Sequence, residues 1–374
     1  MIGVENQYIF KYSIGDKNDF LQEDDLKTFL LVEESGNVLP TFDMTFSCKD
    51  PDILKYLNEG NELKVSFGKY KDKMIDTPFR ISRLVPTRCS ESEYMISITG
   101  IYSALPYIAE DRIQIYSGSG VEVINEVVSR YFKTDFNISA STDSQNWIQG
   151  NVPDKKFIND VWMHSYLGDS FIGVGISANG RFILKDMKRH AATAYKYKFT
   201  HTPTEEKDIS YDGDYVVDDT SGFLNHWLGY GREKHLYNLE DGTESTMLEN
   251  TSRMLALTKT LSRTSAISKR HAEAGLLTDN VHDNYWKAFY RNLQHLAVFN
   301  STKLTFSFHN RFEPIQVLDL VMFMERELDK VGASEWYSGK YFVNKVARSV
   351  SNRQFCTTVQ LCRESLSGIK GDLR

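Results

Sequence analysis

Acidic residues are concentrated in one short stretch of the chain, where they could bind a metal ion or act in catalysis. The segment "YDGDYVVDDT" carries four aspartates, Asp212, Asp214, Asp218 and Asp219. Clustered carboxylates can hold calcium, or a pair of them can act as acid and base in glycoside hydrolysis. The segment lacks the closing Glu of a calcium-binding loop. We therefore interpret it as a solvated turn, with a carbohydrate site as the alternative.

Two glycine-rich stretches raise the possibility of a nucleotide site. "GVGISANG", from Gly173, lacks dinucleotide-motif spacing and is typical of strand, turn and strand. "SGSGVEVINEVV", from Ser117, opens a predicted helix that could attract an anion, but it lacks the Gly-Lys-Ser/Thr of a nucleotide loop. We interpret Ser119 as a helix cap and predict no cofactor.

No other constellation is typical of catalysis. The nine histidines include no HExxH pattern, and lone residues such as His164 and His226 are interpreted as structural. The cysteines form no CxxC pair and have no nearby His at zinc spacing, so buried free thiols are expected at Cys48, Cys89, Cys356 and Cys362. We predict no catalytic residue, no metal site and no enzymatic activity.

The charge distribution has one local feature. A net charge of −6 argues against a protein that holds nucleic acid by neutralising phosphates. Between Thr251 and Ala272, however, the sequence has no acidic residue. The basic side chains of this predicted helix are Arg253, Lys259, Arg263, Lys269 and Arg270. They could form a docking face for an acidic partner or nucleic acid, or simply a solvated helix surface.

Composition indicates a multidomain, strand-rich protein. The chain has 374 residues, more than a single hydrophobic core usually contains. Its hydrophobic content of 41% and charged content of 25% are those of a globular protein. Aromatic residues at 13% favour strands. Because the N-terminus lacks the pattern of a signal peptide and no apolar run reaches about 18 residues, we expect synthesis in the cytoplasm and no membrane span.

Alternation of apolar and polar residues predicts strands in residues 1 to 110. A short helix is predicted in "PDILKYLNEG", with Asp50 as cap and Gly60 as stop. Residues 111 to 205 then combine two predicted helices with a hairpin, whose Asn179-Gly180 pair favours a tight primed turn. A strand is predicted in "FLNHWLGYG" from Phe223, followed by a long helical stretch over 247–299 and further strands.

The two strand-rich regions repeat one order. "TFDMTFSC" and "ELKVSFG" match "TKLTFSFH" and "LDLVMFM", sharing Thr-Phe-Ser at 45–47 and 305–307. The hairpin "FRISRLV…YMISITG" matches "FVNKVAR…CTTVQL". We therefore predict an α+β, mainly β fold with two similar antiparallel β-barrel domains. Residues 1–110 form the first barrel and 111–205 an α+β domain; 206–246 and 300–374 form the second barrel, with 247–299 as its helical insertion.

Local segments add a family resemblance. "GSGVEVINEVVSRYF" resembles the glycine turn and helix after the first barrel of the central baseplate hub proteins of contractile-tailed bacteriophages. "FINDVWMHSYLGDSFIGVGISANGRFILKD" resembles the helix and hairpin of their second domain, and "GKYFVNKVARSVSNRQFCTTVQLCRE" their closing hairpin. In that hairpin Arg348 replaces a frequent His, while Thr358, Leu361 and Arg363 follow the pattern. The family is related to phage late control protein D and to type VI secretion spike proteins.

The resemblance implies a structural protein of the virion, assembled in the host cytoplasm. It implies a homotrimer whose two barrels per chain make a pseudo-sixfold ring, joining the sixfold tail tube to the trimeric central spike. Implied partners are the spike, a tube or tube-initiator protein and other baseplate proteins, with DNA passing through without sequence-specific binding. The alternative is a carbohydrate-binding or carbohydrate-cleaving tail protein, using the acidic turn and exposed aromatics such as Trp147.

Overall fold

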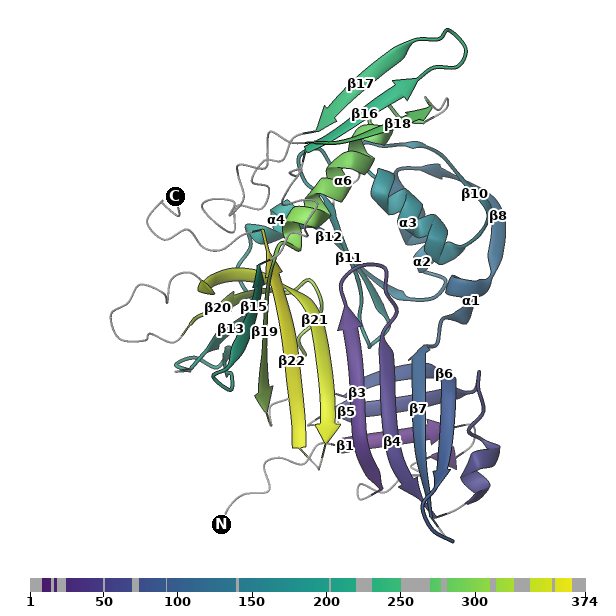
Figure 1. Ribbon diagram of the computed structural model, residues 1–374, viewed down its shortest axis with the longest axis vertical. Coiled ribbons are helices and arrows are strands. Elements are labelled where there is room, and N and C mark those ends of the chain that lie inside the picture. The colour runs from purple at the N-terminus through teal and green to yellow at the C-terminus, as the bar shows by residue number, and fades with distance from the viewer. Residues whose placement is uncertain are drawn as a thin grey trace.

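A computed structural model describes most of the chain, and strands dominate it (Figure 1). The described residues are 9–14, 17–18, 25–49, 51–68, 74–91, 93–138, 141–201, 203–219, 231–249, 270–276, 281–309, 314–325, 337–351 and 354–364. Within them the α+β, mainly β class is confirmed, and no sheet closes into a barrel. None of the described helices has both the length and the apolar character needed to cross a membrane.

The first strand-rich region forms one half of a large sheet. Its strands are β1 (Ile9–Ile14), β2 (Lys17–Asn18), β3 (Leu26–Glu34), β4 (Thr41–Cys48), β5 (Glu62–Gly68), β6 (Ile75–Arg88) and β7 (Tyr94–Tyr102). They lie in the order β3-β4-β7-β6-β5-β1-β2. Alternate residues such as Phe42, Met44 and Phe46 are buried, as the period-two pattern predicts. The predicted helix after β4 is a 3-10 helix, η1 (Pro51–Lys55), and Gly60 adopts φ +83° where that segment turns.

The second strand-rich region forms the other half. Its strands are β13 (Tyr197–Thr200), β14 (Asp208–Ser210), β15 (Tyr215–Asp219), β19 (Thr302–His309), β20 (Leu320–Phe323), β21 (Gly339–Ser351) and β22 (Gln354–Arg363). They pair in the order β15-β19-β22-β21-β20-β13-β14. β21 also pairs with β3, so the two halves share a single fourteen-stranded sheet.

The two halves repeat one strand order. β4-β7-β6-β5-β1 in the first corresponds to β19-β22-β21-β20-β13 in the second, although β13 is parallel to β20 whereas β1 is antiparallel to β5. Each closing hairpin has a β-bulge at the same point, between Ile81 and Arg83 on β6 and between Val343 and Lys345 on β21. Bulges mark a definite register, so they align the two halves residue by residue.

This alignment corrects the predicted match of the Thr-Phe-Ser segments. With the bulges superposed, Thr45 corresponds to Ser307 rather than to Thr305. The side-chain contacts agree: Thr45 Oγ1 lies 3.1 Å from Ser97 Oγ, and Ser307 Oγ lies 2.8 Å from Thr358 Oγ1. A shift of two residues leaves every side chain on the same face of its strand, which is why the sequence pattern did not reveal it.

The middle region packs helices on smaller sheets. It contains α1 (Leu105–Ala109), β8 (Asp111–Gly118), α2 (Gly120–Val128), β9 (Lys133–Asn137), β10 (Gln145–Pro153), α3 (Asp154–His164), β11 (Ile172–Ile176), β12 (Arg181–Asp186) and α4 (Met187–Ala191). Ser119 caps α2 as predicted, within a capping box that Glu122 completes. β8 pairs with β10, and β12 lies between β11 and β9.

The hairpin of β11 and β12 turns differently from the prediction. Only Gly180 has a positive φ, +72°, whereas the type I′ turn that an Asn-Gly pair favours needs a positive φ at both residues. The Gly180 N–H donates to the Ser177 carbonyl and the Ser177 N–H donates to the Arg181 carbonyl. This is a type I turn closed by a left-handed glycine, the geometry of a longer hairpin loop.

The predicted helical insertion is helical only in its later part. α6 (Tyr285–Phe299) is a helix, but the described residues before it include strands β17 (Glu244–Glu249) and β18 (Arg270–Leu276), which flank β16 (Gly231–Tyr237). The spacing of Tyr285, Ala288, Phe289, Leu293 and Leu296 predicts an apolar stripe on this helix, but the buried face of α6 differs from it. Ala288, Asn292, His295 and Phe299 are buried on it. Polar Asn292 belongs there because its amide donates to the carbonyls of Met163 and Ser165 at 3.0 Å. The predicted strand from Phe223 lies outside the described residues, apart from its last glycine.

Candidate functional site

The predicted basic docking face lies almost wholly outside the described residues. Arg253, Lys259, Arg263 and Lys269 are not described, and Arg270 begins strand β18 rather than continuing a helix. The described part of the chain therefore brings none of these residues together. Their role as a docking face stays a prediction.

The acidic stretch lies partly in a turn and partly on a strand. Asp212 Oδ2 lies 2.5 Å from His309 Nδ1, so this carboxylate is engaged by an imidazole on β19. Asp218 lies on β15, where it is exposed. No group of three or more His, Cys, Asp or Glu side chains that could hold a metal ion occurs in the described ranges. The described acidic residues of this segment therefore place negative charge along a strand edge and do not form a cluster of metal ligands.

Two expectations about single residues need correction. Trp147 is buried, and its indole N–H donates to the Gly118 carbonyl at 3.0 Å, so it is not an exposed aromatic for sugar binding. Cys89 is exposed, whereas only Cys362 of the four free thiols is fully buried. His164 is buried and structural, as expected: its ring stacks on Tyr285 at 3.8 Å. His226 lies outside the described residues.

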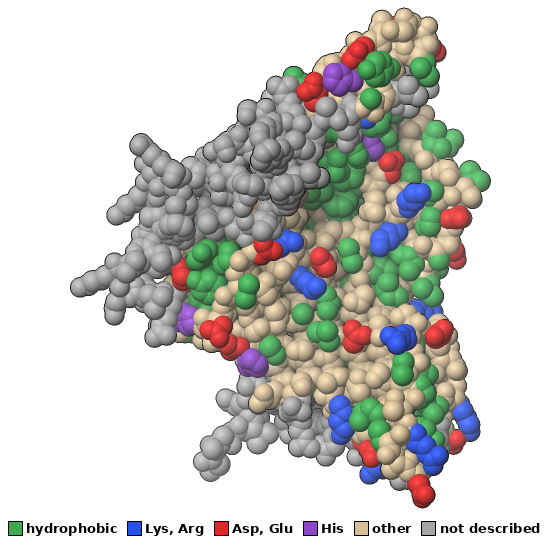
Figure 2. Space-filling model, viewed as in Figure 1, with side chains coloured by type: hydrophobic (Ala, Val, Ile, Leu, Met, Phe, Trp, Pro, Cys, Tyr) green, Lys and Arg blue, Asp and Glu red, His purple; other side chains and the backbone are tan. Residues whose placement is uncertain are grey.

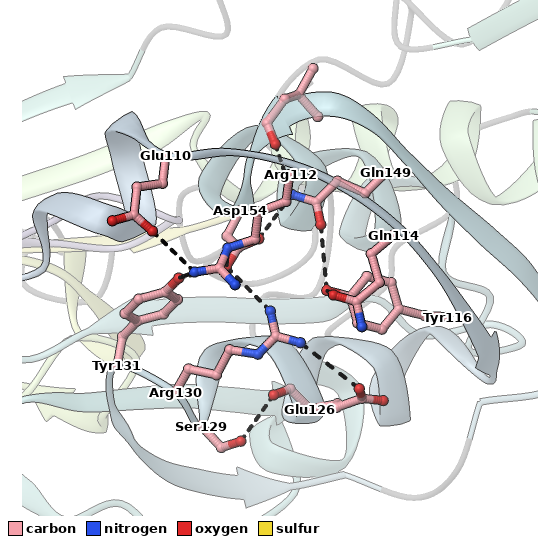
Figure 3. Close-up of polar contacts among 11 residues, drawn as sticks. Glu110, Arg112, Gln114, Tyr116, Glu126, Ser129, Arg130, Tyr131, Gln149 and Asp154 are labelled. Carbon is pink, nitrogen blue, oxygen red and sulfur yellow. Dashed lines mark hydrogen bonds and ion pairs between the residues drawn. The ribbon is translucent and has the colours of Figure 1, made fainter.

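A polar network that the sequence did not reveal surrounds the first residue of α3 (Figure 3). Asp154 is completely buried and lies 3.5 Å from Arg112 Nε on β8 and 3.6 Å from Arg130 Nη1 after α2. Its carboxylate also accepts hydrogen bonds from the Tyr131 hydroxyl and the Gln149 amide, both at 2.8 Å. The helix N-terminus favours a negative charge at this position.

This network holds elements of the fold together. Each Asp154 oxygen accepts a hydrogen bond, and the side chain is completely buried, so the carboxylate is not exposed to a substrate. Burial, followed by the hydrogen bond to Asp154, raises the pKa of Tyr131 to about 12, which keeps its hydroxyl protonated as the donor. The network joins β8, β10, α2 and α3, and a buried carboxylate left without these partners would be costly. A helix-initial Asp after Pro153 was the only local signal for it.

A second buried pair joins the two halves of the large sheet. Glu33 on β3 and Arg348 on β21 form an ion pair with side chains only 2% and 1% exposed. Glu33 also accepts the Ala178 N–H at 2.5 Å, and Arg348 donates to the Ile315 carbonyl at 2.5 Å. The pair thus fastens the first half, the second half and the β11–β12 turn to one another.

Two kinds of open surface remain. Among the described strands, β15 has only β19 as a neighbour, and none but β7 pairs with β6 beyond Arg80. On the β8–β10 ribbon, Ile115 pairs with Ile148, and these side chains are 65% and 70% exposed beside Ile113 at 82%. Open strand edges and contiguous exposed apolar residues are typical of surfaces that other proteins cover.

Solved structures with this architecture are tail and spike proteins. A tail protein from Neisseria meningitidis aligns with a TM-score of 0.60 and 9% identity, over 96% of this chain and 97% of that one. The 43 kDa tail protein of prophage MuSo2 from Shewanella oneidensis aligns with a TM-score of 0.61 and 9% identity, over 96% and 100%. A chain of the Francisella PdpA–VgrG complex aligns with a TM-score of 0.54 and 9% identity, over all of this chain and 61% of that one.

These features define a fold that is shared by tail proteins and by a chain of the PdpA–VgrG complex. No protein-family model and no curated protein sequence matches the chain. The resemblance in fold to baseplate hub relatives is confirmed by the structural neighbours. At 9% identity the likeness establishes the fold alone.

Proposed function

We propose that this protein is the central baseplate hub of a phage-type tail. Three chains form a ring of six similar half-sheets, one face of which matches the sixfold tail tube and the other the trimeric spike. The repeated strand order of β4-β7-β6-β5 and β19-β22-β21-β20 within one chain is the observation that carries this proposal. A duplicated unit lets three chains occupy six equivalent positions, as closed symmetry requires.

The proposed organisation keeps the predicted units with one addition. Residues 1–110 supply the first ring unit, and 206–246 with 300–374 supply the second, which β13 joins by pairing with β20. Residues 111–205 form the α+β domain between them, and 247–299 an insertion. In the virion, the basic segment from Arg253 to Arg270 and the exposed isoleucines of the β8–β10 ribbon face neighbouring baseplate, tube or spike proteins.

The proposed role is structural, without a catalytic step. The buried network at Asp154 has no free acid, base or nucleophile for one. DNA passes through the assembled ring during ejection, and a net charge of −6 suits that passage because a basic lining would retain phosphate. The preferred location is the virion, after assembly in the host cytoplasm.

The mass of the protein in solution tests this proposal. Light scattering on the protein at micromolar concentration, alone and with the spike protein, is expected to give the mass of a trimer. A permanent trimer of this kind should bury on the order of 2,000 Å² at each interface between chains. Electron micrographs of the same sample should show a ring with an open centre. A protein that stays monomeric in both states, or that forms a dimer, is not a hub.

A further inference from the structure

The contact between the two halves of the chain has a definite pattern. Residues 28–34 of β3 pair antiparallel with 345–351 of β21, and we name this contact the internal seam. The β3 side ends in Glu33 and Glu34, while the β21 side carries Lys345 and Arg348. One strand of the seam is therefore acidic and the other basic.

β15 is the counterpart of β3 in the second half. β3 pairs antiparallel with β4, and β15 pairs antiparallel with β19, which is the counterpart of β4. The bulge alignment sets Leu30 and Val216 at equivalent positions. The sequences then agree as well: "FLLVE" from Phe29 corresponds to "YVVDD" from Tyr215. β15 thus has the side-chain pattern of a seam strand, but its outer edge has no partner among the described strands.

β6 is the counterpart of β21, and its outer edge is open in the matching place. β21 pairs with β22 on one side and with β3 on the other over 345–351. β6 pairs with β7 as far as Arg88, whereas β5 covers its other side only as far as Arg80. In residues 83–88, the side chain of Leu84 is half-buried and the others are exposed. The described part of the chain therefore lacks a strand where β3 lies in the internal seam.

We propose that β15 of one chain adds to the edge of β6 in a second copy, repeating the internal seam between chains. This inference rests on the proposed hub function and deepens it by naming the contact that holds the ring together. β15 and β6 lie on opposite sides of the molecule (Figure 1), so each chain offers one edge of each kind. Such a head-to-tail contact closes into a ring when its rotation matches that of the internal seam.

Charge and exposure are complementary across this contact. The internal register, carried over, sets Val85 opposite Asp218 and Thr87 opposite Val216. Arg83 then lies diagonal to Asp218 on the same face, within reach of a long side chain. Val216 and Val85, which are 69% and 39% exposed, share that face and would both be covered. Lys and Arg side chains gather at the lower right of Figure 2, around the ends of β6 and β7.

Pro86 takes the position of Arg348 and makes the two contacts unequal. Proline has no N–H and is found on edge strands, where its nitrogen faces away from the paired strand. The contact between chains therefore has at most one backbone hydrogen-bond donor fewer than the internal seam. The buried pair of Glu33 and Arg348 is also absent there. The contact between chains is accordingly weaker than the internal seam.

Disulfide crosslinking tests the proposed register. In a Cys89→Ser background, Val85→Cys is combined with Asp218→Cys, and the purified protein is mildly oxidised. Non-reducing denaturing electrophoresis is expected to show covalent dimers and trimers that a reductant returns to monomers. The matched control combines Val85→Cys with Asp214→Cys. An offset of four residues, about 13 Å along a strand, exceeds the roughly 7 Å Cα separation that a disulfide spans, so the control should stay monomeric on the gel.

Light scattering on the same samples separates the two proposals. A trimer that crosslinks in the Val85→Cys, Asp218→Cys variant and not in the control supports the contact. A trimer with no crosslink, or with equal crosslinking in the control, overturns the contact and leaves the hub proposal standing. A monomer or a dimer overturns both. As a second measurement, Arg83→Glu should raise the concentration at which the trimer dissociates several-fold, and adding Asp218→Lys should restore it.

Discussion

At the scale of single residues, Arg348 shows how a departure from the pattern of the proteins that this chain resembles can have a physical reason. Its guanidinium is buried between the Glu33 carboxylate and the Ile315 carbonyl. A guanidinium carries several fixed donors and stays charged, so it can serve both acceptors at once. A histidine at this position would offer fewer donors and would titrate near neutral pH. The arginine therefore belongs with the buried glutamate opposite it.

Removing that arginine should be costly. Arg348→Met leaves Glu33 buried without its counter-charge, and the loss of one partner of a buried pair costs about 3 to 5 kcal/mol. Urea unfolding measures the change in the free energy of unfolding. Arg181→Met, at an exposed position, is the control and should change it by less than about 0.5 kcal/mol. Equal stability of both variants would contradict the importance assigned to the pair.

His295 on α6 should make the protein sensitive to acid. Burial, with a further contribution from nearby Arg291, lowers the pKa of His295 to about 3, whereas an unfolded histidine titrates near 6.5. Below pH 6.5 the unfolded chain takes up a proton that the folded chain does not, so acid favours unfolding. Between pH 7.5 and 5.0 this group should remove about 2 kcal/mol from the free energy of unfolding.

Urea unfolding of His295→Gln at the two pH values checks this expectation, because the variant should lose correspondingly less stability in acid. His235→Gln is the control. The hydrogen bond to Glu244 raises the pKa of His235, so His235 stabilises the folded protein as the pH falls. Removing His235 therefore cannot reduce the loss of unfolding free energy in acid. An unchanged acid loss in His295→Gln would show that the imidazole is not held neutral.

At the scale of elements, local signals in the sequence were sufficient for several helices and hairpins. Ser119 caps α2 as predicted, and Glu122, three positions later, completes a capping box with it. The two closing hairpins were visible from alternation, since each buries one face of adjacent strands. These elements depend on neighbours in the chain, so a single sequence contains what specifies them.

Elements that depend on distant partners were not predictable in the same way. β18 pairs in parallel with β16, about forty residues away, and its sequence has no clear alternation. The Asp154 network joins four elements, and only the helix-initial position of the aspartate was visible locally. The pairing of β3 with β21 spans more than three hundred residues, so the strand pattern predicted two separate barrels where one shared sheet exists.

Gly100 on β7 should tolerate no side chain. A Cβ there would lie 2.2 Å from a ring carbon of Phe42 and 2.7 Å from the Arg80 carbonyl oxygen, beside the bulge of β6. Gly100→Ala should therefore lower the free energy of unfolding by about 1 to 3 kcal/mol, the cost of overpacking. Gly150→Ala is the matched control, because a Cβ on that strand glycine meets nothing within 4 Å. Thermal unfolding of both variants distinguishes crowding from a general effect of alanine in strands.

At the scale of the whole molecule, the fold joins duplication to assembly. In the proposed ring, the internal seam is the contact between the two ring units of one chain, with acidic β3 beside basic β21. β15 and β6 have the same complementary signs, and their outer edges have no partner among the described strands. An open strand edge favours aggregation of a free monomer, and the proposed ring would cover both edges.

Thermal stability should therefore depend on protein concentration. Assembly binds the folded chain and not the unfolded one, so mass action raises the unfolding temperature as concentration increases. Differential scanning fluorimetry from about 0.5 to 50 micromolar is expected to show a steady rise for the natural protein. Arg83→Glu weakens the contact between chains without touching a buried side chain, so its unfolding temperature should vary less over the same range. If both proteins unfold at one temperature whatever the concentration, the ring does not contribute to stability, and β6 is not the edge that β15 covers.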